Sequence, residues 1–334
     1  MPRPRHLRAA TLVAIAIAIA AVVASAVAAG AAGGPIAASG APVQLLASGL
    51  PSPTAFAWDG TTMFVGDGPA DPTFAPGGLF TLANGVGTLV PGSPKYVFGL
   101  AWHDGRLYVS TGPTIETMSG WDGTQFASIK TIWSGSPQFF GFNGIAFGPD
   151  GRLYAGLGLK EPTYDHSKDP YWLSQAVVSM TAAGKDLRII ARGIRQPFQL
   201  DFPQGSRYPY VTDLGQDGGA IPPDEIVVAR PGENYGFPTC TWLVLSKCGG
   251  YRRPKILLPA HASPMGIASI GHTLYVALFT GIGGNNPEVV TIPTRGGKPT
   301  PLVTDFGVQI IALAIHAGEL YVGTVDGAIY EVAV

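Results

Sequence analysis

The sequence has few cysteines, few charged side chains and no excess of either charge. Only two cysteines occur, charged residues make up 13% of the 334 residues, and the formal net charge is -1. Proteins that bind nucleic acids or anionic membranes usually have a strongly basic surface, so the overall charge does not favour either partner. A hydrophobic content of 46% can bury a large core, which excludes disorder for most of the chain.

A sustained helical period is also missing from the sequence. Glycine and proline are both frequent, with 46 and 30 residues, and the apolar runs are short and alternating. This pattern is typical of antiparallel strands joined by tight turns. It predicts an all-β fold.

The N-terminal segment is typical of an export signal. Three arginines precede an uninterrupted apolar run from Leu12 to Val27, and Ala24, Ser25 and Ala26 form a small-x-small cleavage site. An uncleaved anchor is the alternative, because the run approaches the length of a spanning helix. We expect a signal peptide or weak anchor over residues 1–29, a flexible tether over 30–42 and the folded domain over 43–334.

Cys240 and Cys248 close a short loop with the sequence CTWLVLSKC. In an exported protein, two nearby cysteines favour a disulfide over a zinc site, which needs further Cys or His ligands at close spacing. We expect the disulfide to hold together an insertion.

One pattern recurs along the chain: an apolar strand, a turn with Gly and often Asp, and a strand with an aromatic residue followed by small residues. The clearest copies read AFAWDGTTMFVGD, GLAWHDGRLYVST and GIAFGPDGRLYAGLG. Six copies carry an aromatic residue at the matching position: Phe64, Tyr108, Tyr154, Tyr210, Tyr275 and Tyr321. Their spacing is typical of propeller blades, which must stack to bury both faces.

The sequence therefore predicts a six-bladed β-propeller. The segment VQLLASG at Val43–Gly49 is expected to supply the outer strand of the last blade, whose own sequence stops at IYEVAV, and so to close the ring. The repeat turns, with Asp59, Asp104 and Asp150, would lie on one face and serve the backbone. The opposite face would collect a polar set: Asp67, Phe139–Asn143, Lys160, Glu161, Arg195, Gln196, Asp213, Gln216 and His261.

The stretch Gly193–Pro238 concentrates the groups that could bind a cation or an anionic cofactor. Arg195 precedes the innermost strand of the fourth blade, and TDLGQD follows its second strand. The side chains of Asp213 and Gln216 and the carbonyls around Gly215 would converge at the central funnel, with donors that suit calcium. The alternative is that Asp213 and Gln216 only cap turns, and that Asp224 and Glu225 belong to a solvated loop.

These residues resemble the glucose/sorbosone dehydrogenase family, the soluble pyrroloquinoline-quinone-dependent sugar dehydrogenases. The matches are GIRQPFQLDF, TDLGQD, DEIVV and RPGENYGFP, in the family's order, together with NGIAFGPDGRLYAGLG and HASPMGIA. The likeness covers most of the chain from the third blade onward.

The resemblance implies that a bound quinone accepts a hydride from the anomeric carbon of a sugar. A histidine would act as the base, calcium would polarise the quinone, and an arginine would stabilise negative charge. Arg195 takes the arginine role, while Asp213, Gly215 and Gln216 fall in the calcium and cofactor element and Gln196 replaces an asparagine. Asp224 and Glu225 match a family element that could equally anchor the loop.

Besides Gln196, the sequence departs from the family at two further places. The family's histidine falls where this chain has Phe139, Phe140 and Phe142, and its last-blade arginines fall where the chain has Val308-Gln309-Ile310. His261 is the candidate substitute base or ligand, and Lys160 the candidate partner of an anionic cofactor. The aromatic residues could form a sugar-stacking rim or pack between blades: Phe139, Phe140, Phe142, Tyr164, Tyr171 and Trp172.

Three functions remain open from the sequence. The leading hypothesis is an exported sugar dehydrogenase acting on an aldose or polyol with quinone and calcium. The second is a propeller that binds calcium or a ligand without catalysis, since the base is missing. The third, by analogy of fold alone, is a lactonase-type hydrolase.

Overall fold

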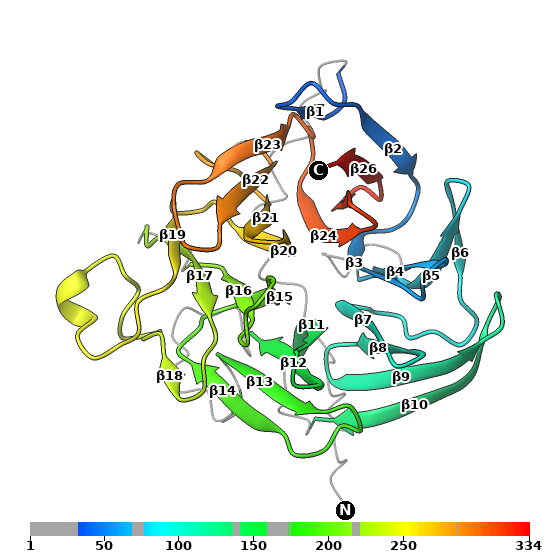
Figure 1. Ribbon diagram of the computed structural model, residues 1–334, viewed down its shortest axis with the longest axis horizontal. Coiled ribbons are helices and arrows are strands. Elements are labelled where there is room, and N and C mark those ends of the chain that lie inside the picture. The colour runs from blue at the N-terminus through cyan, green and yellow to red at the C-terminus, as the bar shows by residue number, and fades with distance from the viewer. Residues whose placement is uncertain are drawn as a thin grey trace, which may run out of the picture.

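The computed structural model describes residues 33–68, 77–135, 141–158, 173, 175–215, 221–284 and 286–334. Six sheets of four or five strands surround a common axis as the blades of a propeller (Figure 1). The all-β, six-bladed prediction is confirmed.

The first three blades follow each other along the chain, with the innermost strand first. Their strands are β3 (Pro53–Trp58), β4 (Met63–Asp67), β5 (Gly78–Ala83) and β6 (Val86–Leu89); β7 (Gly99–His103), β8 (Arg106–Ser110), β9 (Thr114–Trp121) and β10 (Phe126–Ser134); and β11 (Phe142–Phe147), β12 (Arg152–Leu157), β13 (Ala176–Thr181) and β14 (Arg188–Arg192). A short strand from further along the chain, β18 (Glu233–Asn234), extends the third blade by pairing parallel with β14.

The last three blades repeat the plan, and the N-terminal strands complete two of them. Blade four contains β15 (Pro197–Asp201), β16 (Tyr210–Asp213), β17 (Asp224–Val228) and β19 (Ile256–Leu258); blade five contains β20 (Pro264–Ile270), β21 (Thr273–Leu278), β22 (Glu288–Pro293), β23 (Thr300–Thr304) and β1 (Ile36–Ala37); blade six contains β24 (Ile310–His316), β25 (Glu319–Thr324), β26 (Ile329–Ala333) and β2 (Val43–Ala47).

The matching aromatic residues of the six repeats all lie on the second strand of their blade. Their rings pack among the blades, and several hydroxyls reach out of the apolar layer to a polar partner. Tyr154 donates to Asp150 Oδ2 at 3.0 Å, and Tyr321 donates to Glu331 Oε1 at 2.8 Å. A tyrosine suits this position because its ring is buried while its hydroxyl is satisfied at the edge.

The innermost strands form a closed ring in which each contacts the next, in the order β3, β7, β11, β15, β20, β24 and back to β3. A side chain also crosses the centre of this ring, since Gln199 Nε2 on β15 donates to the carbonyl of Thr54 on β3 at 3.2 Å. Gly144 of β11 allows this approach, because a Cβ on it would lie 3.1 Å from Gln199 Cα. The central axis of the propeller is therefore partly filled by this side chain, below the end of the ring at which Arg195 lies.

The N-terminal strand closes the ring as the sequence predicts. Val43 pairs with Val332 and Leu45 with Tyr330, so β2 lies antiparallel to β26 and covers the edge of the last blade (Figure 1). The expected tether is partly structured, because Ile36 and Ala37 pair with β23 and Ala37 is buried. For these two residues, the expectation of a flexible tether is corrected.

An insertion between β18 and β19 projects from the rim beside the fourth blade (Figure 1). It contains the short helix η1 (Leu245–Lys247), and the expected disulfide joins Cys240 to Cys248. Trp242 is buried beside both cysteines and donates its indole N–H to the carbonyl of Tyr235 at 3.0 Å. The disulfide and this tryptophan hold the insertion against the blade.

Several sequence predictions lie outside the described residues. They concern the signal or anchor segment of residues 1–29, and Phe139, Phe140, Lys160, Glu161, Tyr164, Tyr171, Trp172 and Gln216. In the described part of the chain, no helix is long and apolar enough to cross a membrane.

The strand pairing predicts how N-terminal truncation affects stability. A chain that starts at residue 41 loses only β1, and we expect its melting temperature to fall by a few degrees. A chain that starts at residue 49 also loses β2 and exposes the edge of β26, so we expect a fall of more than about 10 °C or aggregation. Calorimetry on both truncations checks this, and equal melting temperatures would contradict the closing role of β2.

Candidate functional site

Asp213 holds the start of the innermost strand of blade four to the end of the second. Its Oδ2 accepts the backbone N–H of Arg195 at 3.1 Å, and its Oδ1 accepts the backbone N–H of Gln196 at 2.6 Å. Pro197 pairs directly with Asp213 across the two strands and has no N–H of its own to give. The aspartate therefore accepts the two backbone N–H groups that precede the proline.

Arg195 lies above this junction with its side chain turned toward the loop after β16. The residue is only 5% exposed. Its Nη1 donates to the carbonyl of Leu214 at 3.2 Å and to the carbonyl of Gly215 at 2.6 Å. The arginine and the TDLG segment, which the resemblance assigns to one site, are thus in direct contact.

Asp224 links this site to the fifth blade. Its Oδ1 accepts the N–H of Gly215 at 2.5 Å, and its Oδ2 accepts the N–H of Ser263 at 2.6 Å. Ser263 directly precedes β20, the innermost strand of blade five. One carboxyl group therefore fixes both the loop that faces Arg195 and the start of the next blade.

The alternative of a solvated loop for Asp224 and Glu225 is wrong. Both residues belong to β17 and are buried, with exposures of 3% and 7%. The run DEIVV is a strand inside the blade because its apolar residues pack in the core while its first two residues face the polar end. Burial, together with the negative charges of Asp213 and Asp224, raises the pKa of Glu225 well above its usual value.

The same end of the blade contains a second carboxyl group with a raised pKa. Burial raises the pKa of Asp213 to about 7, although its two backbone N–H bonds and the nearby Arg195 act in the opposite direction. Asp213 can therefore exchange a proton near neutral pH, and Glu225 beside it also holds its proton more tightly than a carboxyl group in water. Such groups are suited to general acid–base chemistry when a substrate reaches them.

A small cavity connects these groups. It is lined by residues from the loop after β16, by the start of β17 and by the insertion, and it includes Arg195, Asp213, Gly215, Glu225 and Thr241. Its volume of about 10 Å³ accommodates roughly one water molecule. Arg195 and Glu225 thus bring a cationic and a protonatable group to one enclosed point.

The other predicted site residues lie near this point but have different roles. The side chain of Gln196 packs against Gly158, where an added Cβ would meet Gln196 Oε1 at 2.4 Å. His261 is half-buried in the loop before β20, and its carbonyl accepts the hydroxyl of Thr280. The His261 side chain makes no hydrogen bond with other described residues, so the structure does not join it to the network. Phe142 is 1% exposed against Trp133 and packs in the core.

Asp67 occupies the position in blade one that Asp213 occupies in blade four. It ends the second strand, pairs with Pro53 and accepts the N–H of Ser52 at 2.8 Å on Oδ2. Its Oδ1 has no hydrogen-bond partner within the described ranges, and burial raises the pKa of this carboxyl to about 7. The sequence predicts that Asp67 lies on the same face as Arg195. Its equivalence to Asp213 is seen only from the strand register, in which each aspartate pairs with a proline.

Whether the oxygen atoms at this site can bind calcium depends on the position of the Arg195 side chain. Within the described ranges, no group of three His, Cys, Asp or Glu side chains is arranged to hold a metal ion. The carbonyls of Leu214 and Gly215 accept hydrogen bonds from Arg195, and both oxygens of Asp213 accept backbone N–H groups. Calcium needs six to eight oxygen ligands, so it can use these carbonyls only where the guanidinium gives them up.

Comparisons with solved structures show that the chain has the fold of the six-bladed propellers, and several of the similar structures are sugar dehydrogenases. The PQQ-bound aldose sugar dehydrogenase of Streptomyces coelicolor matches with a TM-score of 0.70 and 23% identity, over 87% of this chain and 98% of that one. A calcium structure of a carbohydrate-active enzyme of family AA12 from Trichoderma reesei matches with a TM-score of 0.73 and 14% identity, over 89% and 96%. The resemblance found in the sequence is confirmed at the level of the fold.

The same comparisons include other functions. A candidate gluconolactonase matches with a TM-score of 0.60 and 14% identity, over 89% of this chain and 93% of that one. No protein-family model matches the chain. A protein of Borreliella burgdorferi is 36% identical over 103 residues, and the match spans 27% of each protein's length. Proteins with different activities therefore share this fold.

The role of Asp224 predicts different effects for two substitutions. Asp224→Ala removes both acceptors and leaves the N–H groups of Gly215 and Ser263 without this partner, at a cost of about 2–4 kcal/mol in the free energy of unfolding. Asp224→Asn keeps one acceptor and should cost less. Urea unfolding measures both, and equal effects of the two variants would contradict the bridging role.

The raised pKa of Asp67 predicts a pH-dependent stability. The folded state holds this proton more tightly than the unfolded state, so its contribution to the free energy of unfolding falls as pH rises from about 4 to about 7. Asp67→Asn keeps the acceptor for Ser52 and needs no proton. We expect it to be about 1–3 kcal/mol more stable than the natural chain at pH 8 and nearly equal to it at pH 5. Unfolding at both pH values tests this, and a loss of stability that is the same at both would disprove it.

Proposed function

We propose that this protein is an exported oxidoreductase of the soluble sugar dehydrogenase type, which oxidises an aldose or a related polyol at the Arg195 end of blade four. The observation that carries the proposal is the direct contact between Arg195 and the Leu214–Gly215 carbonyls beside buried Glu225. These are the elements in which the sequence resembles that family. The propeller fold supports the proposal, and the disulfide supports an oxidising compartment.

Arg195 is the group that would hold an anionic cofactor. Pyrroloquinoline quinone, when bound, supplies the acceptor for the hydride of the substrate. Calcium would use the carbonyls of Leu214 and Gly215, which Arg195 now occupies. Ion binding and release of the guanidinium are therefore coupled, and a released Arg195 would balance negative charge on the ligand. Gln216 remains part of the proposed calcium element, with Asp213 and Gly215.

Glu225 is the proposed proton acceptor. The position of the family's histidine carries phenylalanines here, and these cannot take a proton. The carboxyl of Glu225 makes no hydrogen bond or ion pair with other described residues, lines the cavity beside Arg195 and has a raised pKa. The raised pKa makes the ionised form of Glu225 a stronger base than a carboxylate in water, and this form can accept the hydroxyl proton of a sugar.

Titration with quinone distinguishes the role of Arg195 in binding the cofactor from the role of Glu225 in accepting a proton. The natural chain, loaded with calcium, should quench the fluorescence or shift the absorbance of pyrroloquinoline quinone and oxidise at least one aldose in a dye-linked assay. Arg195→Met should lose quinone binding. Glu225→Gln should keep binding and lose turnover by about 10²–10⁴-fold, the range for a general base.

The control is Arg295→Met, which removes an exposed arginine in a turn of the fifth blade. It should leave quinone binding and turnover unchanged. Failure of the natural chain to bind quinone with calcium present would overturn the proposal. Equal turnover of Glu225→Gln and the natural chain would overturn only the role of Glu225.

A binding function without catalysis is the second candidate. It is supported by the satisfied state of the Leu214 and Gly215 carbonyls and by a cavity that holds about one water molecule. On this account the protein binds a small ligand or calcium and shows no oxidation of any aldose. Tight quinone binding with turnover would exclude it.

A further inference from the structure

Two cavities lined by basic side chains lie beside each other at the third and fourth blades. The larger has a volume of about 400 Å³ and is lined by Arg152, Arg188 and Arg207, with Asp150 and Tyr208. The smaller has a volume of about 240 Å³, and its four basic residues are Arg230, Arg252, Arg253 and Lys255. Three basic residues in one cavity and four in the other make a third of the 21 in the chain.

These cavities lie on the turn face of the propeller, away from Arg195. Arg152 begins β12 directly after the Asp150 turn, and Arg207 and Tyr208 lie in the turn between β15 and β16. Arg195 and Asp213 lie at the opposite ends of the strands of blade four. The basic cavities are therefore separated from the proposed oxidation site by the height of the blade.

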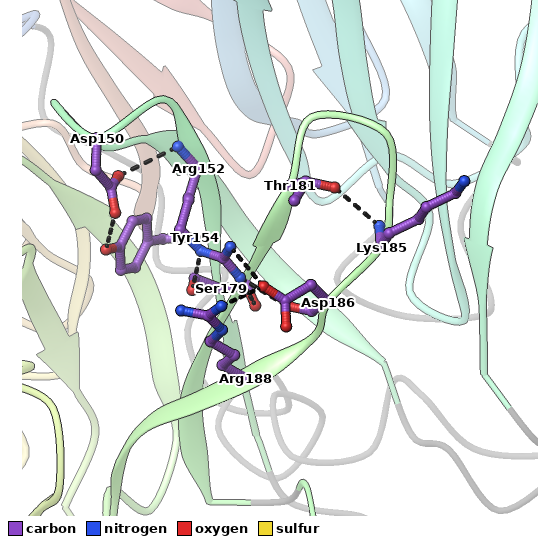
Figure 2. A network of polar contacts seen from close by, with 8 residues as sticks. All are labelled: Asp150, Arg152, Tyr154, Ser179, Thr181, Lys185, Asp186 and Arg188. Carbon is purple, nitrogen blue, oxygen red and sulfur yellow. Dashed lines mark hydrogen bonds and ion pairs between the residues drawn. The ribbon is translucent and has the colours of Figure 1, made fainter.

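One part of the basic cluster is neutralised by acidic neighbours. Arg152 donates to Ser179 and to Asp186, whose carboxyl also contacts Arg188 at 2.5 Å (Figure 2). Arg252 pairs with Glu233 at 3.3 Å. These pairs fix the walls of the two cavities.

The remaining basic side chains of the two cavities can bind an anionic ligand. Arg207, Arg253 and Lys255 are exposed, and none of them forms an ion pair or hydrogen bond of its side chain with another described residue. The guanidinium of Arg230 lies 5.4 Å from the centre of the Tyr208 ring. Among the residues that the structure describes, the two cavities thus offer several cationic groups that have no carboxylate bound to them.

The two cavities form one elongated site. Arg230 lines the smaller cavity, and the next residue, Pro231, lines the larger. The ring of Tyr208, which also lines the larger cavity, lies under Arg230. A ligand with several units could therefore pass over Arg230 and place anionic groups on both sides.

We propose that this elongated site binds an acidic oligosaccharide, a chain of uronic-acid units. The planar guanidinium groups match carboxylates, and a cavity of about 400 Å³ has the size of a site for a small ligand such as a sugar unit. Asp150 lines the same cavity and accepts the hydroxyl of Tyr154 and the backbone N–H of Arg152, and the second lone pair of each carboxylate oxygen can accept a hydroxyl group of a sugar unit. This inference does not depend on the proposed oxidation.

The test uses the full chain and an oligomer of galacturonic acid, with affinity measured by calorimetry at low and moderate salt. Arg207→Ser with Arg253→Ser removes one exposed arginine from each cavity. We expect the affinity of this double variant to fall by about tenfold or more, because each lost bond is a charge-assisted one. The matched control combines Arg106→Ser with Lys130→Ser, which removes two exposed basic side chains from blade two and should change affinity less than about twofold.

Two further probes separate the chemistry of the ligand from its charge. The methyl-esterified oligomer has the same sugar units without the charge and should not bind. Polyglutamate of equal charge should bind at least about tenfold more weakly. The proposal is overturned if the galacturonate oligomer does not bind below about 1 mM, if the control variant weakens binding as much as the double variant, or if polyglutamate binds as tightly.

Discussion

The junction held by Asp213 is the interaction on which the upper end of blade four depends. The innermost strand starts with a proline, so the two N–H groups before it need an acceptor, and the carboxyl that ends the second strand provides both bonds. This places the backbone of Arg195 and Gln196 and fixes the direction in which the arginine side chain leaves the strand. Asp67 does the same for Ser52 in the opposite blade.

These junctions have an electrostatic consequence. A buried carboxyl without full compensation takes up a proton more readily than one in water, so the polar end of the propeller contains carboxyl groups that titrate near neutral pH. Glu225 and Asp224 bring two more buried carboxyl groups to this end from the adjacent strand β17. The charge of Arg195 is then balanced by groups whose protonation can change when a ligand or an ion enters.

Much of the fold could be predicted from the sequence. The six aromatic repeats, the closing strand at Val43 and the disulfide each follow from local patterns, because turn chemistry and alternating apolar residues determine them directly. The proposed meeting of Arg195 with the TDLG segment is also seen in the structure.

The rest of the site depended on strand register, which sequence patterns do not give. Asp224 and Glu225 follow two prolines and look like part of a loop, yet they start a buried strand because β17 pairs with both β16 and β19. The occupation of the Leu214 and Gly215 carbonyls by Arg195 could not be predicted either, since it depends on the side-chain direction that Asp213 sets. The basic cavities at blades three and four come from residues that lie far apart in the sequence.

In the proposed function, calcium would displace Arg195 from the carbonyls of Leu214 and Gly215. A crystal structure of the protein with calcium and pyrroloquinoline quinone tests this most directly. We expect an ion on these two carbonyls, with the Arg195 guanidinium turned away from them and toward the quinone. An Arg195 side chain still bonded to both carbonyls, with no ion or quinone at this end of blade four, would contradict it.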